Sequence, residues 1–242
     1  VEVCLRQARY AEVTSNYAAA LTATQQAVTQ AQQIHDTVGE TGARLAWARI
    51  LCRQGDYLAA AGLVQSAQLL VGTGHDRRHE AQCLYNLGLL AMLQDNYALA
   101  QTHCHEALAI CHTGHYEAVE ADSLNLLGLI HYHLGDYPAA RNYFEQAILI
   151  YYTIGDRRGE LEPFYTIGLL ELRQDNYEAS REYFEQTLDI GREIGDREAV
   201  GEALSNLGVV YFRLGDYRMA QGYQVQALDF REEIGNQVGQ AD

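Results

Sequence analysis

Apolar residues between positions 124 and 154 recur at the spacing of two amphipathic helices joined by a short turn. The turn is marked by Gly135, which suits the left-handed conformation after a helix, and Asp136, which suits an N-cap. The apolar positions are Leu124, Leu127, Ile130, Ala140, Phe144, Ala147 and Ile148. The pattern predicts one helical hairpin over this stretch.

The same hairpin pattern recurs every forty residues along the whole chain. We call the position of a residue within its forty-residue repeat its place. Place seventeen always holds tyrosine: Tyr17, Tyr57, Tyr97, Tyr137, Tyr177 and Tyr217. Place sixteen always holds a residue that can cap a helix: Asn16, Asp56, Asn96, Asp136, Asn176 and Asp216. A fixed period of this size predicts a solenoid of stacked units.

Small residues stand at three further places, where two antiparallel helices have to approach closely. Place eight holds Ala8, Ala48, Gly88, Gly128, Gly168 and Gly208. Place twenty holds Ala20, Ala60, Ala100, Ala140, Ser180 and Ala220. Place twenty-seven holds Ala27, Ala67, Ala107, Ala147, Thr187 and Ala227. The tyrosine at place seventeen is expected to fill the corner of each hairpin, with its hydroxyl near water.

At these places the chain resembles the tetratricopeptide repeat, and the match extends over its full length. The common form of that repeat has 34 residues, so forty residues imply longer helices. This form is similar to the Pins-type adaptors and to the repeat arrays of bacterial STAND signalling ATPases. The resemblance implies an all-α, right-handed α-solenoid of six helix-turn-helix units in one domain, residues 1–242. The units are expected at residues 1–40, 41–80, 81–120, 121–160, 161–200 and 201–240.

The two ends of the sequence suggest a piece excised from a longer protein. The first repeat is the weakest copy, and the chain begins in phase at Val1 without a methionine. At the far end, Gln237, Val238 and Gly239 resemble the approach to a seventh first helix.

Charge narrows the possible partners. The net charge of −15 disfavours a nucleic-acid partner, because binding to phosphate needs basic surface. The charge is uneven: residues 41–80 carry five arginines against three acids, whereas residues 161–200 carry four arginines against ten acids. A solvated acidic exterior is the simplest interpretation of the acidic part.

Motifs for targeting and catalysis are missing from the sequence. It contains no apolar run of 18 residues and no signal-peptide layout, so neither a membrane span nor secretion is predicted. Five scattered cysteines suit a reducing cytoplasm. Because no nucleophile elbow, phosphate-binding loop or dinucleotide fingerprint occurs, we expect no enzymatic activity and no cofactor.

Repeat 3 contains the one stretch that suggests a metal site. Cys111 and His115 would lie one helical turn apart if the helix continued. We expect Gly114 to end the helix first, and Cys104 stands where Phe144 stands in the next repeat. The sequence therefore favours packing over metal binding for these residues, with zinc as the alternative.

Repeat 5 departs from the pattern in its expected core. Glu171 replaces an apolar residue, and Ser180 and Thr187 replace alanines. We expect the three to hydrogen-bond to one another, with His131 as a further partner, because a lone buried carboxylate is costly. A pH-sensitive or ligand-reading site is the alternative. In the same repeat, Pro163 predicts a helix that starts late or kinks near Gly159.

By resemblance to the tetratricopeptide family, places 2, 5, 6, 9, 12 and 13 of the first helices line a concave groove. The groove residues implied in this way are Arg49, Arg53, Tyr85, Asn86, Leu89, Met92, Asn125, Leu129, Tyr132, His133, Tyr165, Leu169, Leu172, Arg173, Asn206, Val209, Phe212 and Arg213. They give an apolar floor in repeats 3–6 and a basic lip, and an acidic lip is expected at place 2. The asparagines suit the backbone of an extended peptide.

Two functions remain open at this stage. The first is a scaffold that binds a peptide or helix of another protein in its groove. The second is the sensor or autoinhibitory arm of a larger bacterial signalling ATPase or effector. The carboxylate clamp of chaperone-binding relatives, which needs Asn at place nine and Lys at place thirteen, is missing. A chaperone tail is therefore not expected as the ligand.

Overall fold

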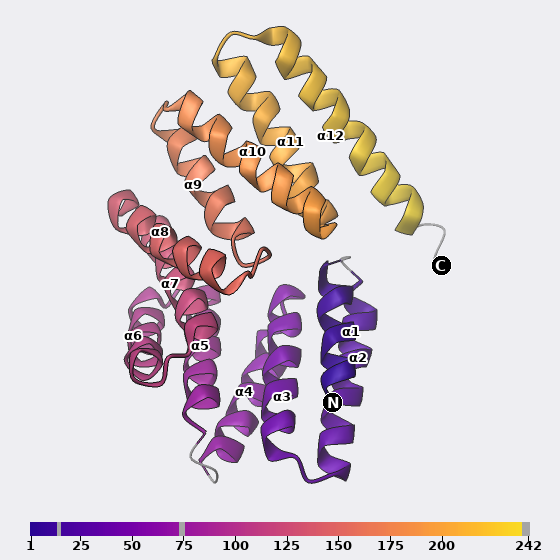
Figure 1. Cartoon of the computed structure of the whole chain (residues 1–242), viewed down its shortest axis with the longest axis vertical. Helices are drawn as coiled ribbons and strands as arrows, with labels where there is room; N and C mark the ends of the chain where they lie inside the picture. Colours follow the sequence, from indigo (N-terminus) through magenta and orange to yellow (C-terminus); the bar gives the residue numbers. More distant parts are fainter. Residues whose placement is uncertain (14–15, 73–75, 239–242) are drawn as a thin grey trace. The chain divides into compact units, whose positions relative to one another are not determined.

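The computed structural model describes residues 1–13, 16–72 and 76–238 (Figure 1). Over these ranges the chain forms twelve α-helices and no β-strand. The helices are α1 (Glu2–Val13), α2 (Tyr17–Gln33), α3 (Thr37–Arg53), α4 (Tyr57–Val71), α5 (Arg77–Leu93), α6 (Tyr97–Gly114), α7 (Glu117–His133), α8 (Tyr137–Ile154), α9 (Leu161–Arg173), α10 (Tyr177–Ile194), α11 (Arg197–Arg213) and α12 (Tyr217–Val238). The second helix of all six repeats begins at the tyrosine of place seventeen, as the forty-residue period predicts.

The helices divide into two compact units, residues 1–150 and 151–242, and each is described by itself. Within each unit, consecutive helices pack as hairpins, and the odd-numbered first helices also contact one another: α1 with α3, α3 with α5, α5 with α7, and α9 with α11. The all-α repeat architecture is therefore confirmed, whereas a single domain over residues 1–242 stays a prediction.

Local hydrogen bonds explain where the helices start and stop. The turn inside repeat 4 has Gly135 at φ 79°, in the left-handed region that glycine tolerates. The carboxylate of Asp136 then accepts a hydrogen bond from the backbone N–H of Ala139 at 3.3 Å. In repeat 5 the equivalent Asn176 makes no such bond, because its Nδ2 donates to Glu171 at 2.9 Å. The predicted cap at place sixteen is thus replaced in this repeat by a contact with a buried carboxylate.

In repeats 3 to 6, place eight of the first helix lies directly against place twenty-four of the second helix. A Cβ added at Gly128 would lie 2.5 Å from Cε1 of Phe144, and one at Gly168 would lie 2.8 Å from Cε1 of Phe184. Both phenylalanines are fully buried. In the other four repeats, place twenty-four holds a smaller or a polar residue. The pairs at places eight and twenty-four are Ala8 and Thr24, Ala48 and Val64, Gly88 and Cys104, and Gly208 and Gln224. The match between a glycine at place eight and a large ring at place twenty-four is thus a feature of repeats 4 and 5.

Helix α9 starts four residues later in its repeat than its counterparts, as Pro163 predicts, because proline lacks the N–H that an earlier start would use. Residues 157–160 form turns instead. The ring of Tyr151 packs over this segment, where a Cβ added at Gly159 would lie 2.3 Å from its Cδ1. Within unit 2, the buried tyrosine thus packs against the glycine of the turn that precedes α9.

The polar residues of repeat 5 find partners other than those predicted. Glu171 is 2% exposed and accepts the hydrogen bond from Asn176. Ser180 Oγ donates to the carbonyl of Gly168 at 2.8 Å, and Thr187 Oγ1 donates to the carbonyl of Tyr183 at 2.9 Å. Because a hydroxyl has only one proton to donate, the prediction that Glu171, Ser180 and Thr187 bond to one another is wrong. A contact with His131, which belongs to the other unit, stays a prediction.

A glutamate stands at place forty in repeats 1 to 4, and two of these side chains differ sharply in environment. Glu40 accepts hydrogen bonds from Gln32 Nε2 at 2.9 Å and Arg44 Nε at 3.0 Å. Burial alone would raise the pKa of Glu40, but these bonds outweigh it and hold the pKa below its usual value. Glu160 is 2% exposed and pairs with Arg157, yet its Oε1 has no hydrogen-bond partner among the residues that the structure describes. Burial therefore raises the pKa of Glu160 despite the arginine.

The last described residues continue the final helix, α12. Gln237 and Val238 belong to α12, and Gly239 lies outside the described residues, so the predicted approach to a seventh first helix is not seen at positions 237 and 238.

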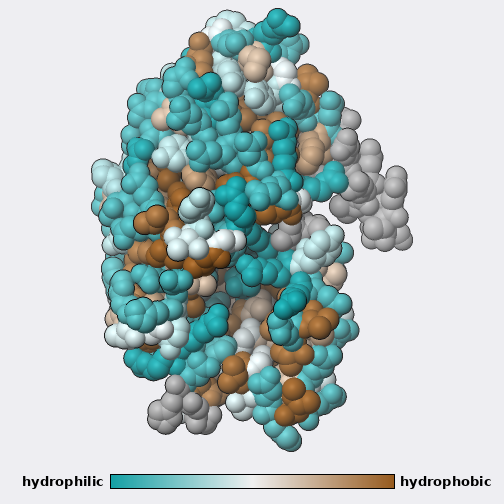
Figure 2. All heavy atoms as spheres, in the orientation of Figure 1, coloured by the Kyte–Doolittle hydropathy of each residue, from teal (hydrophilic) through white to brown (hydrophobic). Residues whose placement is uncertain are grey.

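No helix within the described ranges is long and apolar enough to cross a membrane. Figure 2 shows hydrophilic side chains over most of one face, with hydrophobic side chains between them.

The packing of place eight against place twenty-four predicts a volume-coupled pair. Gly128→Ala should destabilise the protein by roughly 1–3 kcal/mol, because the added methyl overlaps the ring of Phe144. Phe144→Val, the residue type of repeat 2, should also destabilise alone but should relieve the cost of Gly128→Ala in the double variant. Thermal and urea unfolding of all four proteins measures the coupling.

Gly62→Ala is the matched control, since Gly62 lies in α4 with nothing within 4 Å of an added Cβ. This change should stabilise the protein by about 0.5–1 kcal/mol. Strict additivity of Gly128→Ala and Phe144→Val would contradict the assigned contact.

The two glutamates at place forty predict opposite responses to loss of charge. A lowered folded pKa stabilises the fold above the unfolded pKa of about 4.3, and that stability is lost as the pH falls. A raised folded pKa stabilises the fold at low pH, and that stability is lost as the pH rises through the folded pKa. At pH 7, Glu40→Gln should therefore lower the melting temperature, whereas Glu160→Gln should raise it.

The pH dependence separates this account from a simple packing effect. The advantage of Glu160→Gln over the wild type should grow between pH 4.5 and pH 7 in thermal denaturation. A lower melting temperature for Glu160→Gln than for the wild type across this range would show that the buried carboxylate is stabilising and would refute the assignment.

Candidate functional site

The first helices of unit 1 surround a cavity of about 310 Å³. Because α1, α3, α5 and α7 lie in sequence against one another, their side chains at the same places meet on one face. The cavity is lined by Leu5, Ala8, Arg9, Glu12, Gly42, Leu45, Ala46, Arg49, Ile50, Arg78, His79, Gln82, Tyr85, Asn86 and Asp122. Of the predicted groove residues, the structure brings Arg49, Tyr85 and Asn86 together here.

The lining of this cavity is rich in charge. Arg49 Nη2 lies 3.8 Å from Glu12 Oε2, and the carboxylate of Glu12 is nearly buried. Arg9 and Arg78 add two further guanidinium groups. His79 Nδ1 lies 2.6 Å from Asp76 Oδ2, which fixes the imidazole at the start of α5. The lining carries three arginines against the two carboxylates Glu12 and Asp122, a small excess of positive charge in a chain with a net charge of −15.

Further along unit 1, the predicted floor residues are half-buried. Leu89, Met92, Leu129 and Tyr132 each keep part of their surface open to solvent. The ring of Tyr132 packs edge-on against His133 at 5.7 Å, between ring centroids. Partly open apolar side chains on one face provide contact area for a ligand without destabilising the fold.

Unit 2 presents a second set of predicted residues on α9 and α11. Tyr165, Leu169 and Leu172 are partly buried against the core of the unit. Val209 is 39% exposed and Phe212 is 59% exposed. The exposure of predicted floor residues therefore rises from α9 to α11.

The predicted asparagines are less open than the sequence suggests. Asn86 is 5% exposed and Asn125 is 8% exposed. Nδ2 of Asn86 donates to the carbonyl of Gln82 at 2.8 Å, and Nδ2 of Asn206 donates to the phenol oxygen of Tyr165 at 3.3 Å. Asn86 and Asn206 therefore each use an amide N–H within the fold, and binding of a peptide backbone by the three asparagines stays a prediction.

The predicted lips of the groove are exposed. The basic side chains at place thirteen are all open to solvent: Arg53, His133, Arg173 and Arg213. At place two, Glu2, Glu162 and Glu202 are exposed and Asp122 is half-buried. Since places two and thirteen lie at opposite ends of a first helix, each unit has an acidic edge and a basic edge along this face.

The cavity contains residues that sequence reasoning missed. Leu5, Gly42, Leu45, Ala46 and Gln82 stand at places 2, 5 and 6, so applying the same rule to repeats 1 and 2 and to place 2 of repeat 3 would have found them. Arg78 and His79 stand at places 38 and 39, outside that rule. Arg78 and His79 line the cavity because they lie in the first turn of α5, and the repeat pattern does not predict this position.

The cysteines of repeat 3 are packed in the core, whereas His105, His112 and His115 are exposed. Helix α6 ends at Gly114, and His115 follows at φ 55°, outside the helix. Cys104 and Cys111 are fully buried, and burial raises the pKa of their thiols to about 12 and about 11, respectively. Thiols with such pKa values are poor nucleophiles and poor metal ligands at neutral pH. Among the residues described, no three His, Cys, Asp or Glu side chains cluster in a way that could hold a metal ion.

Hairpins of fixed length, stacked through their first helices within each unit, define a helical repeat protein. The sequence profile of the tetratricopeptide repeat matches residues 80–152 and 161–233, which is more than half of the chain. The chain therefore belongs to the tetratricopeptide repeat family. No curated protein sequence matches it significantly.

Solved structures support the fold at low sequence identity. BtubC from P. vanneervenii matches with a TM-score of 0.72 and 18% identity, over 89% of this chain and 91% of that one. A signal transduction ATPase with numerous domains and a tetratricopeptide repeat sensor, from Pyrococcus horikoshii, matches with a TM-score of 0.76 and 18% identity. The match covers 94% of this chain but only 34% of that chain.

A third similar structure is NprR in complex with its cognate peptide NprX. It matches with a TM-score of 0.61 and 17% identity, over 95% of this chain and 66% of that chain. At these identities the three similarities show the fold.

The packing role of the repeat 3 cysteines gives a prediction about metal. Addition of a chelator should leave the melting temperature unchanged, because a structural zinc would contribute folding free energy directly and its removal would cost many degrees. Cys104→Val should also fold, since Val64 fills the same place in repeat 2. A stoichiometric zinc in the purified protein, measured by atomic absorption, would overturn this assignment.

Proposed function

We propose that the protein is a non-enzymatic interaction scaffold that binds a peptide or helical segment of a partner protein on the face formed by its first helices. The observation that carries the proposal is the cavity of unit 1, where four first helices bring charged and apolar side chains to one surface. The open apolar residues of α7 and α11 extend the same kind of surface within each unit.

Each part of this face suits a different part of a bound segment. Arg9, Arg49 and Arg78 would pair with acidic side chains, and the guanidinium group is well suited to bidentate bonds with carboxylates. Leu129 and Val209 would contact apolar side chains. The complex of NprR with its cognate peptide supports peptide binding by this fold. The acidic surface elsewhere favours a protein partner over nucleic acid or membrane.

A sensor or autoinhibitory arm of a larger signalling ATPase or effector is the second candidate. The similarity to the ATPase with a tetratricopeptide repeat sensor favours it, with a match to about one third of that chain. In this case the face would hold a segment of the same parent protein in the cytoplasm. A nucleotide-binding domain in the same reading frame would favour this second candidate.

The proposal predicts which substitutions abolish binding. Peptides selected from a display library against the wild-type protein should lose affinity for Leu129→Glu or Val209→Glu, because each change buries a charge without a partner at the contact. Arg213→Glu should weaken acidic peptides, chiefly by slowing association and with clear salt dependence. Binding is measured by fluorescence anisotropy, with circular dichroism to confirm that the helices persist.

Glu182→Gln is the control, because Glu182 is exposed on the second helix of repeat 5 and lies away from the first-helix face. It should leave affinity unchanged. If Glu182→Gln removed binding of the selected peptides and the Leu129 and Val209 variants did not, the binding surface would lie on the second helices.

A further inference from the structure

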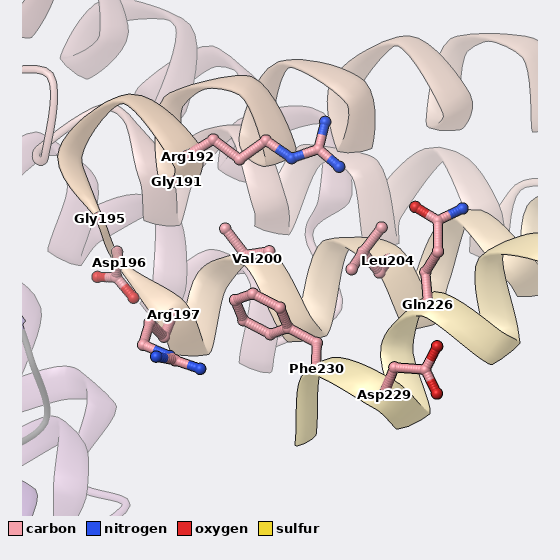
Figure 3. Close-up of a pocket in the computed structure, with 10 residues that line it drawn as sticks. All are labelled: Gly191, Arg192, Gly195, Asp196, Arg197, Val200, Leu204, Gln226, Asp229 and Phe230. Carbon is pink, nitrogen blue, oxygen red and sulfur yellow. The ribbon is translucent and has the colours of Figure 1, made fainter. Parts of the chain in front are cut away.

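A second pocket lies in unit 2, between the end of α10, the start of α11 and the second half of α12 (Figure 3). Its volume is about 410 Å³, within the range of small-molecule sites. The pocket is lined by Gly191, Arg192, Gly195, Asp196, Arg197, Val200, Leu204, Gln226, Asp229 and Phe230. These residues stand outside the places that form the first-helix face, so the site does not depend on the proposed function.

The junction between repeats at this pocket is built from different residues than the other junctions. Place thirty-one holds the buried side chains of Cys111 and Tyr151 in repeats 3 and 4 but holds Gly191 in repeat 5. Place forty, a glutamate in repeats 1 to 4, is Val200 here. A Cβ added at Gly191 would lie 3.1 Å from Cγ2 of Val200, so the valine closes off the space that a side chain at place thirty-one would use. The result is an apolar floor with open volume above it.

The floor and the rim differ in chemistry. Val200 and Leu204 are 4% and 2% exposed, and the ring of Phe230 stands beside them (Figure 3). The guanidinium of Arg197 lies over that ring, with 5.1 Å between its Cζ and the ring centroid. Arg192 extends above the floor from α10 (Figure 3). An aromatic or branched hydrocarbon would therefore bury its surface on the floor within reach of two guanidinium groups.

The two carboxylates of the rim restrict the charge of a ligand. Asp196 accepts a hydrogen bond from the backbone N–H of Ala199 at 3.0 Å, which commits it to capping α11. Asp229 projects from α12 at the edge of the pocket (Figure 3). A ligand with several negative charges, such as a phosphate ester, would be repelled by Asp229, whereas a single carboxylate can pair with Arg192 alone.

We propose that this pocket binds a small amphipathic monocarboxylate, with an aromatic or branched hydrocarbon body on Val200, Leu204 and Phe230 and its carboxylate on Arg192. The hydrocarbon supplies affinity by burial, and the arginine fixes the orientation. The site would allow a metabolite of this class to stabilise the last repeats of the chain, since a ligand that binds only the folded state raises its stability.

The test uses 3-phenylpropionate as the probe, with 3-phenylpropanol as its uncharged counterpart and succinate as a dianion without the ring. Titration of the full chain by ligand-observed NMR should give saturable one-to-one binding of 3-phenylpropionate, with a dissociation constant on the order of 1 mM for a ligand of this size. The alcohol should bind roughly fivefold more weakly, and succinate should not bind.

Three variants place the probe in the pocket. Gln226→Trp fills the space from the exposed side of α12 and should abolish binding, with the helical signal unchanged. Arg192→Gln should weaken 3-phenylpropionate roughly fivefold and leave the alcohol unaffected. Arg218→Gln removes an exposed arginine of the same unit outside the pocket and should change neither.

Several results would overturn the proposal. They are no saturable binding of 3-phenylpropionate, binding that survives Gln226→Trp, or equal affinities of acid and alcohol for the wild type. Because none of these variants touches the first-helix face, failure here would leave the peptide-binding proposal intact.

Discussion

In repeats 3 to 6, the contact between place eight and place twenty-four limits how closely the two helices of a repeat can approach. Gly128 and Gly168 accept the rings of Phe144 and Phe184 directly against the helix backbone. With this distance fixed, the first helix of each repeat is held in one orientation relative to its own partner. The first helices of consecutive repeats can then lie against one another and present their side chains at equivalent places on one face.

Much of the fold could be predicted because each repeat carries its own start and stop signals. The tyrosine of place seventeen begins every second helix, and Pro163 delays α9 as its missing N–H requires. The sequence could not predict which hydrogen-bond partners the buried polar side chains would find. Asn176 gives up its cap to reach Glu171, and this depends on side-chain geometry that the period of the sequence does not encode. The same applies to Glu40 and Glu160, which share a place but have pKa values shifted in opposite directions.

The candidate binding face likewise combines features that the sequence predicts with features that it does not. Rules carried over from the family predict which places face a ligand, and Val209 and Phe212 at two of these places are exposed. The cavity of unit 1 instead depends on Arg78 and His79, which enter from the first turn of α5. The pocket of unit 2 depends on Gly191 and Val200, where the repeat pattern is broken. Residues that depart from the repeat pattern thus lie where this chain can differ from other members of its family in the ligands that it binds.

Hydrogen–deuterium exchange in the presence of a peptide selected against the wild-type protein tests the central claim most directly. A segment bound on the first-helix face should slow exchange of backbone amides in α5 and α7, or in α9 and α11, more than in the second helices of the same unit. Protection concentrated in α6 or α10, with the first helices unchanged, would contradict the account and place the binding surface on the opposite side of the repeats.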